Sequence, residues 1–247
     1  MLLLAVDTSG KNGSLALLRT TTLKPKEGLN GAPTNDLTTE CPTFEILELV
    51  PLAGRMYSAQ LIPELQNALK RQKLSVNDID AYVVASGPGS FTGLRVGLST
   101  VKALSEVLHK PIAAVSVLEA AARLVQRKGN VIVALDAGRK QAFVGDYELD
   151  DQFKVLQAKE SLVAFEQFFA SLKNMESTSF SPDQSVRDAA AAHGVTIAES
   201  LTPKANIFAY IGYEKIIAGQ TTPAEVLEAN YIRASDAELF SLPKLMS

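Results

Sequence analysis

The chain has 247 residues, of which 47% are hydrophobic and 21% are charged, and its net charge is −3. These values are typical of a globular protein and exclude a disordered chain, a collagen-like fibre and a coiled-coil rod. The pI near 5.5 argues against a protein that binds nucleic acid alone through a broad basic face. The apolar start, Met1 to Val6, reaches Asp7 at once, which is too short for a signal peptide or a membrane span. We therefore expect a soluble, cytoplasmic protein with no membrane partner.

The hydrophobic pattern predicts strands and helices in alternation along the chain. In chain order, the expected elements are strands at 2–6, 14–19 and 44–52, a helix at 63–73, a strand at 80–86, a helix at 93–109, strands at 131–135, 141–149 and 153–158, a helix at 162–173, a strand at 177–180, a helix at 184–193, a strand at 195–198 and a helix at 204–218. The segment Thr20 to Thr43 is rich in Thr, Pro, Gly and Asn and is expected to be a long surface loop or an extended hairpin tip. Ser116 and Glu119 have the spacing of a capping box for a helix that joins the two halves.

One apolar run occurs twice. Leu2-Leu3-Leu4-Ala5-Val6-Asp7 is echoed by Val131-Ile132-Val133-Ala134-Leu135-Asp136, and each copy precedes a second strand-like run. A similar order of elements follows both copies. The repeat predicts an internally duplicated α/β protein, in which each copy begins with a buried strand that ends in an aspartate.

The two aspartates are the candidate cofactor-binding residues. Asp7 with Thr8 and Ser9, and Asp136 with Gly138, have the form of strand-end carboxylates that hold hydrated magnesium beside phosphates. This pattern would suit an ATP-dependent phosphotransferase. The alternative, which we favour, is that both aspartates end their strands and accept N–H bonds from the following turns. If the lobes are duplicated, we expect Asp7 and Asp136 to face one cleft.

The glycines of the helix after Ser86-Gly87-Pro88-Gly89-Ser90-Phe91-Thr92-Gly93 form a stripe. Gly93, Gly97 and Thr100 share one helical face and leave it thin. Each glycine destabilises a helix by about 1 kcal/mol relative to alanine. Contacts with another backbone that packs closely on the glycine face would offset this loss. We expect that backbone to belong to a partner chain, which would dock through the helix at 93–108 and its neighbour near Pro63. The expected partner interface contains Leu61, Gly93, Arg95, Gly97, Thr100, Val101 and Leu104.

No catalytic residue and no metal ligand is assigned to this chain. The two histidines, His109 and His193, lie far apart and form no His-x-x-x-His pair. No Gly-x-Ser-x-Gly motif is present, so serine hydrolysis is unsupported. The single cysteine, Cys41, stands in a polar stretch and is taken as incidental.

The motifs as a set resemble the bacterial TsaB proteins, also called YeaZ. The resemblance rests on segments along nearly the whole chain. They are Leu4-Ala5-Val6-Asp7-Thr8-Ser9, Leu61-Ile62-Pro63, the block from Ser86 to Gly97, Val115-Ser116-Val117-Leu118-Glu119-Ala120, Leu135-Asp136-Ala137 and Tyr231-Ile232-Arg233. This chain has Tyr57-Ser58 where the family often has His-Ser.

The resemblance implies a duplicated actin-like, Hsp70-like fold, with lobes at 1–108 and 109–247 and the last helix or tail packing back on the first lobe. It further implies a non-catalytic subunit of the complex that forms N6-threonylcarbamoyladenosine at position 37, next to the anticodon, in tRNAs that read ANN codons. The implied partners are a metal-bearing TsaD-like catalytic paralogue, a TsaE-like P-loop ATPase and tRNA as substrate. No cofactor is assigned to this chain, with any ATP or ADP acting through the complex. Alone, the chain is expected to be a homodimer.

Overall fold

The computed structural model describes residues 1–21, 43–53, 56–173, 178–230 and 232. The predicted surface loop is therefore described only at its two ends, and Cys41 lies outside the described residues. Among the described residues, no helix is long and apolar enough to cross a membrane.

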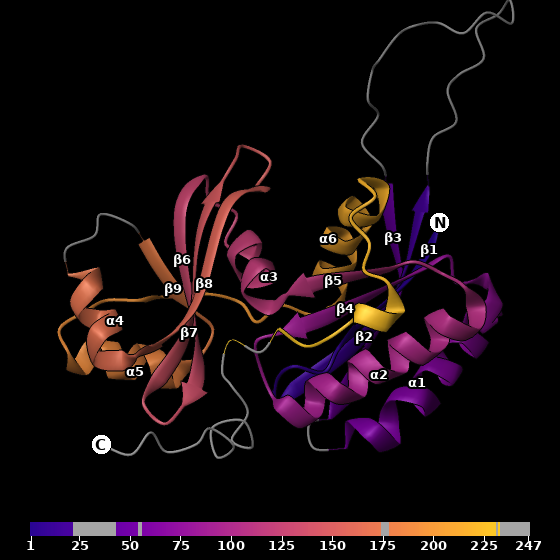
Figure 1. Cartoon of the computed structure of the whole chain (residues 1–247), viewed down its shortest axis with the longest axis horizontal. Coiled ribbons are helices and arrows are strands. Elements are labelled where there is room, and N and C mark those ends of the chain that lie inside the picture. The colour runs from indigo at the N-terminus through magenta and orange to yellow at the C-terminus, as the bar shows by residue number, and fades with distance from the viewer. Residues whose placement is uncertain (22–42, 54–55, 174–177, 231, 233–247) are drawn as a thin grey trace, which may run out of the picture.

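The chain folds into two lobes, each built on a five-stranded mixed sheet (Figure 1). The first sheet contains β1 (Leu2–Asp7), β2 (Asn12–Thr21), β3 (Thr43–Ala53), β4 (Ala81–Gly87) and β5 (Ile112–Ser116), in the order β3-β2-β1-β4-β5. The second contains β6 (Gly129–Gly138), β7 (Gln141–Leu149), β8 (Val155–Ala164), β9 (Thr178–Ser181) and β10 (Ala198–Glu199), in the order β10-β9-β6-β7-β8.

The two sheets have the same topology. β1 pairs antiparallel with β2 and parallel with β4, and β6 pairs antiparallel with β7 and parallel with β9. The repeated run thus forms the central strand of both sheets. The prediction of an internally duplicated α/β fold is confirmed.

Helices cover both faces of the first sheet. α1 (Tyr57–Arg71) and α2 (Phe91–Leu108) pack on one face, where the side chains of Leu4 and Val6 enter the core. α6 (Ala205–Ile217) packs on the other face, against Leu3 and Ala5. A strand buried on both sides reads as a continuous apolar run, which explains the unbroken hydrophobicity of β1.

The remaining helices belong to the second lobe and to the junction. α4 (Phe165–Leu172) and α5 (Gln184–Ala192) pack on the second sheet, on its side away from the first lobe, and α3 (Val117–Leu124) lies between the sheets (Figure 1). Two short 3-10 helices are at Val76–Asp78 and Ala224–Val226. The predicted boundary between the lobes, at residues 108 and 109, precedes β5. In the structure β5 belongs to the first sheet and α6 packs on that sheet, so both elements lie in the first lobe although they follow the predicted boundary.

The predicted start of α1 is wrong. The helix begins at Tyr57 and continues through Pro63. An internal proline costs about 3 kcal/mol, whereas burial of Leu61 and Leu65 on the same helix contributes about 1.5–3 kcal/mol each. Packing therefore outweighs the proline. The boundary between β8 and α4 was also placed too early, because residues 162–164 complete β8.

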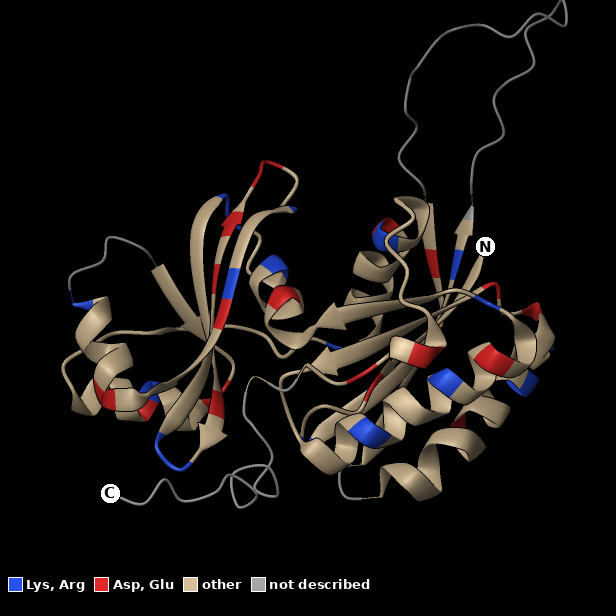
Figure 2. Cartoon of the chain, viewed as in Figure 1, with Lys and Arg blue, Asp and Glu red and all other residues tan. Residues whose placement is uncertain are grey.

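Charged residues are spread over both lobes. Figure 2 shows Lys and Arg interspersed with Asp and Glu on helices and strands of each. Several form ion pairs between elements, such as Arg71 with Glu48 at 2.9 Å.

Candidate functional site

The end of β1 was the first candidate site for a cofactor, and it is buried. Asp7, Thr8 and Ser9 are each almost fully shielded from solvent. The Asp7 carboxylate oxygen Oδ1 accepts bonds from the Ser9 backbone N–H at 2.9 Å and from the Ser9 hydroxyl at 2.6 Å. Burial raises the pKa of Asp7, and the two bonds from Ser9 oppose that shift in part. The Asp7 carboxylate is thus bonded to the turn that follows β1.

The start of α2 packs directly on this turn. The Ser90 N–H donates to the Ser9 carbonyl at 2.7 Å. An ideal Cβ on Gly89 would lie 2.4 Å from the Ser9 carbonyl oxygen, and one on Gly93 would lie 2.1 Å from that of Thr8. These glycines therefore let the start of α2 pack closely against the turn.

The predicted glycine stripe does meet another backbone at Gly93, but that backbone belongs to the same chain. Gly93 and Gly97 are buried, and a Cβ on Gly97 would lie 2.5 Å from the Thr8 hydroxyl oxygen. Assigning these glycines to an outer interface was therefore wrong. Leu61 and Val101 are also core residues, which leaves the following expected interface residues at the surface: exposed Arg95 and half-buried Thr100 and Leu104.

Tyr57 closes the turn from the side of α1. Its hydroxyl donates to the Gly10 carbonyl at 2.8 Å, and a Cβ on Gly13 would lie 2.7 Å from its ring. Burial raises the pKa of the Tyr57 phenol, and the nearby Asp7 carboxylate adds to the shift. The sequence showed Tyr57 as a departure from the family pattern but did not indicate this contact.

The second aspartate has a different environment. Asp136 is exposed, and its carboxylate accepts bonds from the Gly138 N–H at 2.7 Å and the Ser185 hydroxyl at 2.6 Å. The Asp136 N–H donates to the Asp183 carboxylate at 2.7 Å. Both aspartates therefore accept turn N–H bonds, as the favoured alternative held. That they face one cleft stays a prediction. Within the described part of the chain, no three His, Cys, Asp or Glu residues form a group that could hold a metal ion.

A groove of about 470 Å³ lies between α1 and α2 on the surface of the first lobe. It is lined by Ile62, Val76, Ser99, Thr100, Ala103, Leu104, Val107 and Leu108. Ile62 is 41% exposed and Val107 is 74% exposed. Thr100 and Leu104 are among the predicted interface residues, and Ile62 and Val107 are not. Docking through the helix at 93–108 and its neighbour near Pro63 stays a prediction, and the groove lies where these two helices meet.

The α2 helix also carries, near its start, an exposed arginine stacked on an aromatic ring. The guanidinium carbon of Arg95 lies 3.9 Å from the centroid of the Phe91 ring. This distance is typical of a cation–π contact.

Comparison with known proteins identifies the family. Residues 50–235 match the family model for TsaD, tRNA N6-adenosine threonylcarbamoyltransferase. The chain belongs to the TsaD family. Its relatives include the tRNA threonylcarbamoyladenosine biosynthesis protein TsaB of Bacillus subtilis, which is 27% identical with 96% of each chain covered. TsaB of Escherichia coli is 31% identical over 40% of this chain and 45% of that protein.

The fold agrees with the family. The structure of YeaZ from Pseudomonas aeruginosa superposes with a TM-score of 0.66 and 22% identity, covering 93% of this chain and all of that one. A second structure from that organism, described as similar to peptidase YEAZ, has a TM-score of 0.67 and 23% identity over 94% of this chain and 99% of the other. The resemblance to TsaB (YeaZ) proteins within the TsaD family is thus confirmed.

Proposed function

We propose that this chain is a non-catalytic scaffold or activator subunit of a complex that forms threonylcarbamoyladenosine in tRNA. The similarity to TsaB along nearly the whole chain supports a role in tRNA threonylcarbamoyladenosine biosynthesis. The modified nucleoside would be the adenosine at position 37 of tRNAs that read ANN codons. The complex would contain a TsaD-like catalytic paralogue, which would hold the metal, and a TsaE-like ATPase.

The observation that carries this proposal is the apolar groove between α1 and α2. Val107 and Ile62 expose hydrocarbon along its lining, and the side chains at Ser99 and Ala103, which also line it, are small. Contiguous exposed apolar surface on a soluble lobe is typical of a protein interface. Close packing of α2 on the Thr8 turn holds the groove in one shape, and a surface that is ordered before binding loses less entropy on association.

The same packing disfavours the alternative, an ATP-binding phosphotransferase. Phosphate binding needs free N–H groups and space at the β1–β2 turn. Here the Ser90 N–H is bonded to Ser9, and Gly89 and Gly93 lie against the turn's carbonyls. Nucleotide would then act through the complex rather than at this turn.

Binding to the paralogue tests the proposal. The test compares wild type with Val107→Asp, which places a charge in the groove, for capture of a purified TsaD-like subunit. Leu201→Asp is the matched control, because Leu201 is 73% exposed and lies outside the groove lining. We expect Val107→Asp to weaken capture at least tenfold and Leu201→Asp to leave it unchanged. Equal capture by all three proteins would refute docking through the groove.

A further inference from the structure

The short helix α3 is shared by the two lobes. Val117 and Ala120 pack into the core of the first lobe with β1, β4 and α6. Leu118, Ala121 and Ala122 pack into the core of the second lobe with β6 and β7. Because one helix contributes side chains to both cores, any rotation between the lobes must occur about α3 or break one of these contacts.

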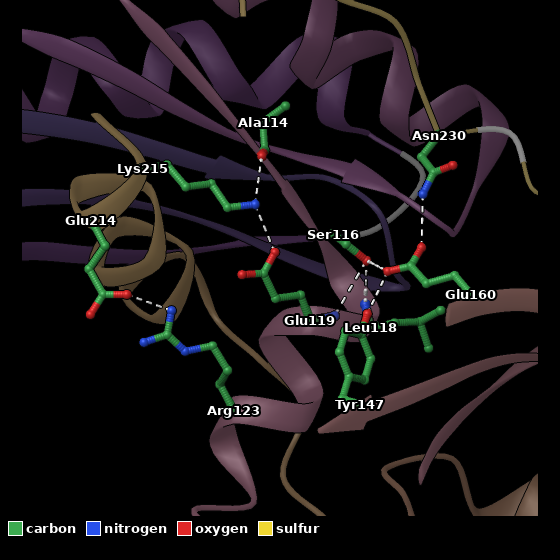
Figure 3. Close-up of polar contacts among 10 residues, drawn as sticks. All are labelled: Ala114, Ser116, Leu118, Glu119, Arg123, Tyr147, Glu160, Glu214, Lys215 and Asn230. Atoms are coloured by element: carbon green, nitrogen blue, oxygen red, sulfur yellow. Dashed lines mark hydrogen bonds and ion pairs between the residues drawn. The ribbon is translucent and has the colours of Figure 1, made fainter. Parts of the chain in front are cut away.

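Glu160 on β8 joins three segments at the N-terminal end of α3 (Figure 3). One oxygen of its carboxylate accepts hydrogen bonds from the Ser116 hydroxyl and the Tyr147 hydroxyl. The other oxygen accepts a bond of 2.9 Å from the side-chain amide of Asn230. Ser116 ends β5 in the first lobe, whereas Tyr147 lies in the second. Ser116 also accepts the Leu118 N–H at 3.1 Å, so Glu160 is tied to the helix cap.

Asn230 belongs to a strap, residues 222–230, that follows α6 along the first lobe. The Thr222 N–H donates to the Ile112 carbonyl, Leu227 is buried in the core beside α2, and the Asn230 N–H donates to the Ser86 carbonyl at 2.7 Å. Ile232, just beyond the strap, packs against the core of the second lobe. The strap therefore runs over the end of β4 and reaches the second lobe at the position of Glu160.

Ion pairs hold the other end of the junction. Lys215 of α6 contacts the Glu119 carboxylate at 2.8 Å and the Ala114 carbonyl at 3.4 Å, and Glu214 contacts Arg123 at 2.7 Å. These pairs fix α3 to the first lobe. The second lobe is joined to this assembly through its packing on α3, through Leu135, which packs against the core of the first lobe, through Ile232, and through Glu160.

We propose that Glu160 is an interlobe latch, which closes on Ser116 and Asn230 and holds the two lobes at one angle. When it is broken, the second lobe turns about α3 while each lobe stays folded. The proposal concerns the chain alone and does not depend on the proposed function.

The latch is tested by the distance between spin labels in the two lobes of the full chain. Labels are attached at Glu106→Cys on α2 and Ala192→Cys on α5, both exposed positions, in a Cys41→Ser background. We expect one narrow distance distribution in the parent. Glu160→Ala and Asn230→Ala should each broaden or shift it, and Glu160→Ala should do so more strongly because it loses both links to the first lobe and strap.

Two control variants distinguish a loss of the Glu160 contacts between the lobes from a general destabilisation of the second lobe. Tyr147→Phe removes a bond to Glu160 that lies within the second lobe, and Glu166→Ala removes an exposed carboxylate on α4. Both should keep the narrow distribution. The proposal is overturned if Glu160→Ala superimposes on the parent, or if Tyr147→Phe broadens the distribution as much as Asn230→Ala. Should Glu160→Ala fail to fold, Asn230→Ala decides in the same way, since its side chain is exposed and its loss leaves the core intact.

Discussion

The carbonyl oxygen of Thr8 lies against Gly93, so close that an ideal Cβ on the glycine would stand 2.1 Å from it. The contact joins the end of the central strand to the first turn of α2. It sets the height of α2 above the sheet and with it the shape of the groove that α2 forms with α1.

Gly93→Ala should destabilise the chain. Alanine is favoured over glycine in a helix by about 1 kcal/mol, but here its methyl group would displace backbone, and overpacking costs about 1–3 kcal/mol. We expect a net loss in the free energy of unfolding, measured by denaturant titration. Gly10→Ala is the control, because its Cβ would meet nothing closer than 3.9 Å. Equal stability of the two variants would show that the helix start can move away from Thr8.

Asp7→Asn should change how stability depends on pH. Burial raises the folded-state pKa of Asp7 above its ordinary value of 3.8, so the folded chain keeps this proton to higher pH than the unfolded chain does. The free energy of unfolding contributed by this group therefore falls as pH rises from 3.8 through the folded-state pKa. Asparagine does not ionise, and its oxygen can still accept from Ser9. We expect the variant to gain stability relative to wild type as the pH rises through this range. A difference in the free energy of unfolding between the two proteins that does not change with pH would contradict a buried, desolvated carboxyl at Asp7.

Tyr57→Phe should cost about 0.5–1.5 kcal/mol, the usual contribution of one hydrogen bond. The variant loses the bond to the Gly10 carbonyl but keeps the ring against Gly13. Thermal unfolding measures the loss. If Tyr57→Phe matched wild type, water would be replacing the hydroxyl, and closure of the turn would rest on the ring alone.

The oligomeric state should depend on the groove. Without a partner, the cheapest cover for exposed apolar surface is a second copy of the same surface across a two-fold axis. We therefore expect wild type to sediment as a homodimer and Val107→Asp as a monomer, with Leu201→Asp unchanged. A dimer that persists in Val107→Asp would place self-association on another surface.

Much of the fold could be predicted from the sequence because the repeated run ending in Asp7 and Asp136 is local and strongly apolar. Buried central strands need no information from distant residues to be recognised. The start of α1 could not be predicted in this way, since the burial of Leu61 and Leu65 that outweighs Pro63 arises only when the helix meets the sheet.

The candidate site was predictable in part. The stripe of Gly93 and Gly97 indicated that a backbone comes close, as one does at Gly93, but spacing within one helix does not say whose backbone it is. The helix at 93–108 and its neighbour near Pro63 were expected to dock a partner, but that Ile62 and Val107 line one groove depends on how the two helices pack. Contacts between distant segments, including those of Glu160, likewise left no local pattern.

The most direct test of the account is tRNA modification in a reconstituted system. The reaction contains purified TsaD-like subunit, TsaE-like ATPase, tRNA and threonylcarbamoyl-AMP. It is run with wild type, with Val107→Asp, with Leu201→Asp and without this chain. A separate reaction contains only this chain, tRNA and threonylcarbamoyl-AMP. Threonylcarbamoyladenosine in the digested tRNA is quantified by mass spectrometry. We predict full modification with wild type and Leu201→Asp, strongly reduced modification with Val107→Asp or without the chain, and none from this chain by itself. Modification by the chain alone, or full modification when it is omitted, would contradict the account.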